Sequence, residues 1–128
     1  MRLYNILKAL AQRPYIKQEG NLGNFHYRIW SNGMIELNTN GVLSLTGTYV
    51  GQAGGVYNYK KDITLPFNIQ TATANATAYG RLGTGIGYCS YMNFTSQNNL
   101  LVYVGGNDNS STMHIAIQIV AFLVGGGS

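Results

Sequence analysis

The spacing of apolar residues constrains the fold of this chain more than any other feature, because it follows a period of two over most of the length. Phe25, Tyr27 and Ile29 form one such series, and comparable series recur in later segments. Successive side chains of a β-strand point to opposite faces, so a period of two is typical of strands buried on one face. The pattern therefore favours an all-β fold.

Turn signals divide the alternating region into short segments. Asn32-Gly33 and Asn40-Gly41 are typical of hairpin turns, and glycine-rich loops follow at 51–55 and 83–87. Strands are expected at 25–30, 34–37, 42–49, 56–65, 69–82, 88–95, 100–104 and 113–123. About eight short strands at this spacing predict an antiparallel β-sandwich or barrel.

Charged residues are scarce, which supports the same fold class and narrows the range of partners. The 128 residues include eight Lys or Arg and four Asp or Glu, giving a formal net charge of +4. A helix-rich protein would need charged side chains on its solvent faces. The basic residues are scattered rather than arranged in a stripe, so binding to nucleic acid is not expected.

The N-terminal segment differs from the rest because its apolar residues have a helical period. A helix is expected at residues 3–12 and is ended by Arg13-Pro14. Its apolar stripe consists of Leu3, Ile6, Leu7 and Leu10. A helix this short needs a packing partner, either its own domain or copies of itself around an axis.

The chain therefore divides into three parts. We expect a helical stem and linker at 1–23, a β domain at 24–124 and a flexible tail at 125–128. No apolar run reaches the length of a membrane-spanning helix, and no signal-peptide pattern opens the sequence. Membrane insertion is not expected. The protein is expected to fold in a cytoplasm.

Residues that could carry redox or metal chemistry are few. Cys89 is the only cysteine, so an intrachain disulfide is excluded, and it is expected to be a small buried residue. His26 and His114 lie far apart in sequence, and each is expected to have an ordinary hydrogen bond in its strand. A metal on a threefold axis is the alternative. No cofactor and no metal are predicted.

The sequence contains no arrangement typical of an active site. The four acidic residues, Glu19, Glu36, Asp62 and Asp108, lie in separate segments, and none forms an evident acid–base pair. The series of glycines at 83, 85 and 87 has the wrong spacing for a phosphate-binding loop and is interpreted as a turn. We therefore do not expect an enzyme, and no catalytic residue is predicted.

The ten tyrosines are the most suggestive functional feature. Tyr49, Tyr57 and Tyr59 flank the loop at 51–55, and Tyr88, Tyr91 and Tyr103 lie near other turns. Such residues serve as core, as subunit interface, or as stacking surfaces for sugars whose hydroxyls bind nearby amides. Because loops most often carry function, ligand contacts are predicted at Gln52, Tyr57, Asn98, Asn107, Asp108 and Asn109.

One segment is informative through its sequence motif and not only through its composition. Residues 26–36, HYRIWSNGMIE, resemble the Y-R-K-W-S-D/N-G-x-x-E hairpin of the C-terminal receptor-binding domains of tailed-bacteriophage fibre proteins. Residues 62–67, DITLPF, look like the T-[LF]-P-x-x-F strand end of that family, and 113–123 like its apolar last strand. Ile29 departs from the usual basic residue, and Leu37-Asn38 replaces an aromatic-Gly pair.

The resemblance covers residues 24–124 and implies a trimeric β-sandwich at the distal end of a viral fibre, with H-type lectins as distant relatives in architecture. It implies a homotrimer that binds a bacterial surface component, a glycan or a protein, and that joins the rest of the tail fibre in the virion. Arg28 and Glu36 would face each other across the first hairpin and could pair. The alternatives are a purely structural trimeric knob or baseplate component, and a glycan hydrolase with a site between subunits.

Overall fold

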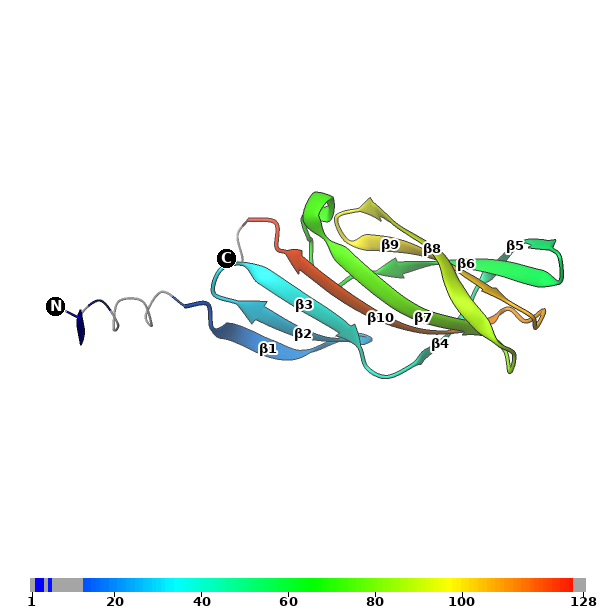
Figure 1. Cartoon of the computed structure of the whole chain (residues 1–128), viewed down its shortest axis with the longest axis horizontal. Helices are drawn as coiled ribbons and strands as arrows, with labels where there is room; N and C mark the ends of the chain where they lie inside the picture. The colour runs from blue at the N-terminus through cyan, green and yellow to red at the C-terminus, as the bar shows by residue number, and fades with distance from the viewer. Residues whose placement is uncertain (1, 4, 6–12, 126–128) are drawn as a thin grey trace.

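The alternating segments form two antiparallel sheets (Figure 1). The computed structural model describes residues 2, 3, 5 and 13–125. The six-stranded sheet contains β1 (Ile16–Leu22), β2 (Phe25–Trp30), β3 (Met34–Thr39), β4 (Leu43–Thr46), β7 (Asn75–Leu82) and β10 (Thr112–Phe122). The four-stranded sheet contains β5 (Thr48–Ala53), β6 (Val56–Thr64), β8 (Gly87–Ser96) and β9 (Asn99–Gly106). The predicted all-β class is confirmed, and the described residues form ten strands rather than about eight.

The last strand, β10, organises the larger sheet. It pairs with β7 along residues 113–120 on one side. On its other side it pairs first with β4, through residues 112–115, and then with β3, through residues 118–122. Strands β2 and β1 continue outward from β3, and the smaller sheet has the order β5-β6-β9-β8.

Three segments differ from the sequence prediction. The expected strand 42–49 divides at Gly47 into β4 and β5, which belong to different sheets, and a Cβ at Gly47 would collide with the Met113 side chain. Strand β1 pairs with β2 inside the segment expected to be a linker. The expected strand 69–82 begins only at Asn75, after a single 3-10 turn at Thr71–Thr73.

The predicted N-terminal helix lies mostly beyond the described part of the chain. Ile6, Leu7 and Leu10 are outside the described residues, as are residues 126–128 of the expected tail. Leu3, which is described, is 68 % exposed. The structure therefore describes only one residue of the predicted apolar stripe.

The core lies between the two sheets and is formed by the inward faces of their central strands. Ile115, Ile117 and Ile119 of β10 are buried there, together with Val102 and Val104 of β9.

Strand β7 has small residues on its inward face. A Cβ at Gly80 would lie 2.8 Å from a methyl carbon of Val104, so glycine allows the two sheets to approach closely.

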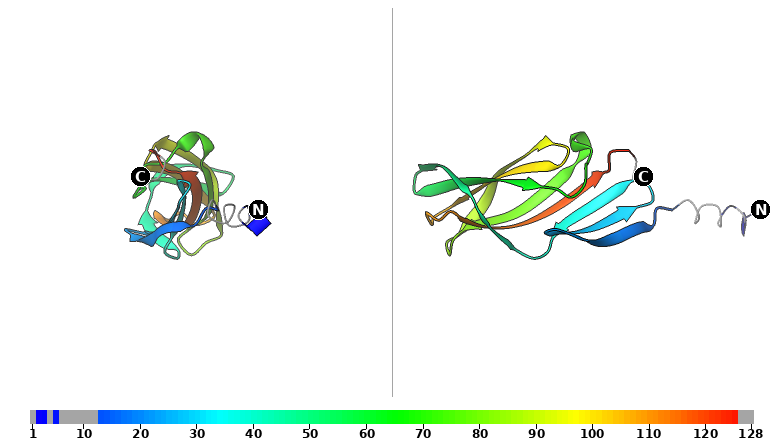
Figure 2. Two further views of the ribbon diagram at one scale, coloured as in Figure 1. Left: turned by 90° about the vertical axis from the view of Figure 1, so that its left-hand side faces the viewer. Right: turned by 180° about the vertical axis from the view of Figure 1, so that it is seen from behind.

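The sandwich is elongated, and its two ends differ. Strand β1 starts and strand β10 finishes at the same end of the sandwich (Figures 1 and 2). The β5–β6 hairpin and the loops at 83–86 and 107–111 lie at the opposite end, which we call the distal end.

Candidate ligand-binding surface

The predicted ligand residues Asn107 and Asp108 fasten two distal loops together. The Asn107 side-chain Oδ1 accepts a hydrogen bond of 2.9 Å from the Ile86 backbone N–H. The Asp108 carboxylate accepts one of 3.1 Å from the Thr84 N–H. A Cβ at Gly85 would overlap the Asn107 side chain. The glycines of the 83–87 segment thus make room for this loop-to-loop contact, and the segment is a turn, as predicted.

Asn109 also has a structural role, because its side chain binds a tyrosine of the core. The hydroxyl of Tyr59 donates a 2.6 Å hydrogen bond to Asn109 Oδ1. Tyr59 is only 7 % exposed, so its hydroxyl needs a partner inside the protein. The amide of Asn109 therefore anchors the 107–111 loop on β6.

The remaining three predicted residues do not form one site. Gln52 and Tyr57 lie opposite each other in the β5–β6 hairpin at the distal end, where Gln52 is exposed and Tyr57 packs against the core. Asn98 lies in the β8–β9 turn and accepts a 3.0 Å hydrogen bond from the Ser96 hydroxyl. That turn adjoins the other end of the smaller sheet, because Asn99 pairs with Thr64.

The structure instead gathers three tyrosines on the outer face of the four-stranded sheet. Tyr91 and Tyr103 are paired across β8 and β9, and their rings meet edge to face with centroids 5.6 Å apart. Tyr88 lies opposite Gly105, in the adjacent position on the same face. Tyr88 and Tyr91 are each 54 % exposed, so both present ring surface to solvent.

The Tyr88 ring lies across β9 because residue 105 is glycine. A Cβ at Gly105 would be 3.1 Å from Tyr88 Cζ and 3.1 Å from the side-chain oxygen of Asn58. The phenol ring therefore lies over the backbone of β9 and reaches toward Asn58 on β6.

We name this surface the tyrosine face; it is formed by Tyr88, Tyr91, Tyr103, Asn58 and Lys60. Lys60 pairs with Tyr103 in the ladder and is exposed. Asp62, farther along β6, accepts a 2.9 Å hydrogen bond from the Asn99 amide. The face combines aromatic rings with amide and ammonium groups, which suits a ligand with apolar faces and many hydroxyls.

Sequence reasoning noted these tyrosines near turns but did not choose them as ligand residues. A register shift between Cys89 and Tyr91 inserts an extra residue in β8. Tyr88 and Tyr91 therefore share a face although they are three positions apart, which breaks the period of two. Because of this bulge, the sequence of β8 lacks the alternation that would have placed Tyr88 and Tyr91 on one face.

The cysteine and the histidines have ordinary partners. Cys89 is only partly buried rather than buried as predicted, and desolvation raises the pKa of its thiol, which favours the neutral form. His26 lies 3.2 Å from both a Glu19 carboxylate oxygen and Asn21 Oδ1, and His114 lies 2.9 Å from the Ser44 hydroxyl. Among the described residues, no three His, Cys, Asp or Glu side chains form a group that could hold a metal ion.

The first hairpin has the expected register but a different ion pair. Arg28 lies opposite Glu36 in the β2–β3 ladder. The Arg28 Nε, however, lies 3.4 Å from a carboxylate oxygen of Glu19 on β1. The ion pair of Arg28 is therefore with Glu19, which β1 brings to the other side of Arg28, and not with Glu36, the partner that the hairpin made possible.

The outer face of the larger sheet has a different chemistry. Two adjoining hollows of about 500 and 420 Å³ lie over β7 and β10, and they share Thr77 and Gln118. All of the residues that line them are uncharged. Tyr79, Val120 and Phe122 are exposed on or beside this surface. Depletion of charge together with exposed apolar side chains is typical of the central part of a subunit interface.

Comparisons with known proteins identify no relative of this chain. Within the described residues, the structure contains no helix of the length and hydrophobicity needed to cross a membrane. No family model, no curated protein and no solved structure matches the chain.

Proposed function

We propose that this chain is the receptor-binding tip domain of a phage tail fibre and that it binds a bacterial surface glycan through the tyrosine face. The observation that carries the proposal is the group of three tyrosines on one sheet face, of which Tyr88 and Tyr91 are exposed and Tyr103 is partly buried. The resemblance of residues 26–36 and 62–67 to phage fibre domains supports it from the sequence.

The chemistry of the face suits a sugar. The broad side of an aromatic ring packs against the C–H groups of a pyranose, while the ring edge and neighbouring amides bind hydroxyl groups. Asn58 offers an amide beside the Tyr88 ring, and Lys60 offers three hydrogen-bond donors beside Tyr103. A neutral or weakly acidic glycan is the ligand class that fits these groups.

We further propose that three copies assemble through the part of the larger sheet's outer face that lies over β7 and β10, where the residues lining the two hollows are uncharged. Burial of Tyr79, Val120 and Phe122 against neighbouring copies would remove exposed apolar surface from water. Light scattering of the full chain is expected to give a mass three times the 13.9 kDa of one chain. A 13.9 kDa species at micromolar concentration would refute the trimer without bearing on the tyrosine face.

Glycan binding is tested on an array of purified bacterial surface polysaccharides. The wild-type protein is expected to bind a small subset, and Tyr88→Ala or Tyr91→Ala to weaken that binding about tenfold or more, because truncating an aromatic anchor removes more than 1 kcal/mol. Tyr15→Ala is the matched control, since Tyr15 is 62 % exposed and lies outside the face. Equal binding by all four proteins would exclude the tyrosine face as the site.

A further inference from the structure

Strand β6 has unequal neighbours on its two sides. On one side, β9 pairs with it from Tyr57 to Thr64. On the other side, β5 pairs with it only from Val56 to Lys60, because the chain crosses to the larger sheet at Gly47. Within the described ladders, residues 61–64 therefore have a partner strand on one side only.

The direction of the backbone groups at this open edge follows from two independent observations. The Leu65 N–H donates a 2.7 Å hydrogen bond to the Asn98 carbonyl beside β9, so odd-numbered residues of this segment bond on that side. Ala53 and Val56 flank the two-residue turn of the β5–β6 hairpin, so even-numbered residues bond on the β5 side. The N–H and C=O groups of Asp62 and Thr64 consequently point to the open edge.

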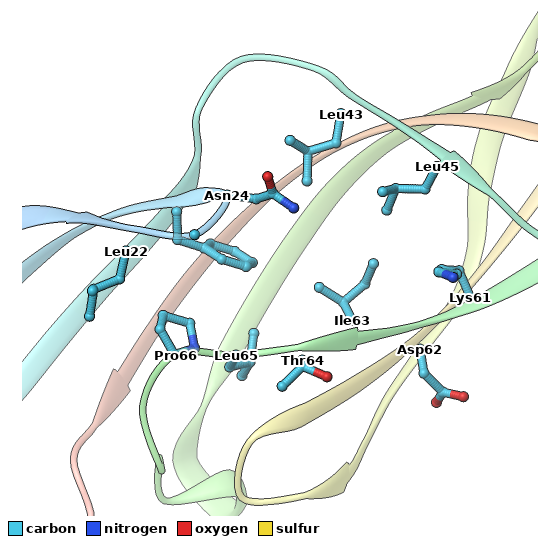
Figure 3. Close-up of a pocket in the computed structure, with 12 residues that line it drawn as sticks. Leu22, Asn24, Leu43, Leu45, Lys61, Asp62, Ile63, Thr64, Leu65 and Pro66 are labelled. Atoms are coloured by element: carbon cyan, nitrogen blue, oxygen red, sulfur yellow. The ribbon is translucent and has the colours of Figure 1, made fainter.

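A hollow of about 400 Å³ lies beside this edge, between the two sheets (Figure 3). Leu43 and Leu45 point into it from β4, and Ile63 points toward them from β6. Asp62 points away from the leucines. A strand placed beside β6 would direct alternate side chains into this apolar space.

The Lys61 side chain limits which residues a strand docked beside β6 could have. It lines the hollow on the same face of β6 as Ile63, and neither ion pair of the described residues includes it. A lysine that points inward at a sheet edge prevents pairing with an apolar strand, because its ammonium group would be buried without a partner. A carboxylate opposite Lys61 offsets part of that penalty, because it pairs with the ammonium group.

We propose that the open edge of β6 at residues 61–64 is a docking site for an extended segment of a partner polypeptide. The segment pairs with the backbone of Asp62 and Thr64 and runs antiparallel to β6, as β5 and β9 do. It places an apolar side chain opposite Ile63 and an acidic one opposite Lys61, so its sequence reads apolar, any residue, acidic. Backbone groups at strand spacing match another polypeptide rather than a sugar or a lipid.

The test is amide hydrogen exchange measured by NMR on the full chain with a probe peptide, acetyl-Thr-Val-Thr-Ile-Thr-Glu-Thr-amide. Without peptide, the amides of Asp62 and Thr64 are expected to exchange rapidly and that of Ile63 slowly. With saturating peptide, exchange at Asp62 and Thr64 is expected to slow at least tenfold. No slowing at millimolar peptide, or slowing confined to the tyrosine face, would overturn the proposal.

Charge and backbone variants identify the contacts. A peptide with lysine in place of the glutamate is expected to bind at least tenfold more weakly, and Lys61→Glu to reverse that preference. Thr64→Pro removes one edge N–H, which an edge strand tolerates, and is expected to abolish peptide binding while the glycan is still bound. An unchanged preference in Lys61→Glu, or full peptide binding by a folded Thr64→Pro, would contradict the docking mode.

Discussion

Replacing Ile119 with alanine is expected to lower the free energy of unfolding by about 2–5 kcal/mol. Ile119 lies on β10 between β3 and β7, and its side chain is 0 % exposed. Its truncation removes buried apolar surface and leaves a cavity that the flanking ladders prevent from closing. Urea unfolding followed by circular dichroism measures the change, which is large beside the 5–15 kcal/mol typical of a whole domain.

Another residue of the same strand provides the control for this substitution. Thr112 is on the outer face of β10, is exposed, and lines neither hollow of the proposed interface. Thr112→Ala is expected to change the unfolding free energy by no more than about 0.5 kcal/mol. A similar loss from the two variants would mean that β10 does not present alternate residues to the core and to the outer face.

Replacing Gly87 with alanine is expected to destabilise the fold by about 1–3 kcal/mol or more. A Cβ at Gly87 would lie 2.6 Å from the Arg81 Cα and 2.7 Å from the Gly105 carbonyl oxygen. Both are backbone atoms of neighbouring strands, so no side-chain movement relieves the overlap. Strand β8 would have to shift, and with it the bulge that aligns Tyr88 and Tyr91.

Gly51→Ala is the matched control for Gly87→Ala. A Cβ at Gly51 would meet no atom within 4 Å, and Gly51 does not have a positive φ. Because alanine narrows the conformations of the unfolded chain, this variant is expected to be neutral or stabilised by up to about 1 kcal/mol. Thermal unfolding of both variants separates the effects, and equal losses would show that backbone overlap is not the cause at Gly87.

The parts of the fold that the sequence predicts are those with strong local signals. Asn32-Gly33 predicts the β2–β3 hairpin, which is confirmed, and the turn at residues 31–33 places Arg28 opposite Glu36. The alternation of Ile115, Ile117 and Ile119 predicts the buried face of β10, which is confirmed. In these segments a local pattern and the tertiary structure agree.

The missed features depend on contacts that are distant in sequence. Strand β1 is exposed along almost its whole length, so no alternation marks it, and its backbone pairing with β2 defines it. The division of β4 from β5 depends on how Gly47 packs against Met113. Neither signal exists in a local window of sequence.

The residues of the candidate site could not be identified from local sequence either. Asn107, Asp108 and Asn109 were predicted to contact ligand because they are polar loop residues, and the structure shows their oxygens accepting hydrogen bonds that hold the distal loops. The tyrosines of the tyrosine face come from two strands, β8 and β9, and a bulge in β8 alters their spacing. Only the paired register of β8 and β9 reveals that Tyr88 and Tyr91 share a surface.

The central claim, that the tyrosine face binds a bacterial surface glycan, is tested most directly on intact cells. Fluorescently labelled protein is added to a panel of bacterial strains before and after periodate oxidation, which cleaves the vicinal diols of surface sugars. We expect the wild-type protein to label some strains, and this labelling to be lost after periodate and in Tyr88→Ala, but not in Tyr15→Ala. Labelling that survives both periodate and Tyr88→Ala, or no labelling of any strain, would contradict the account.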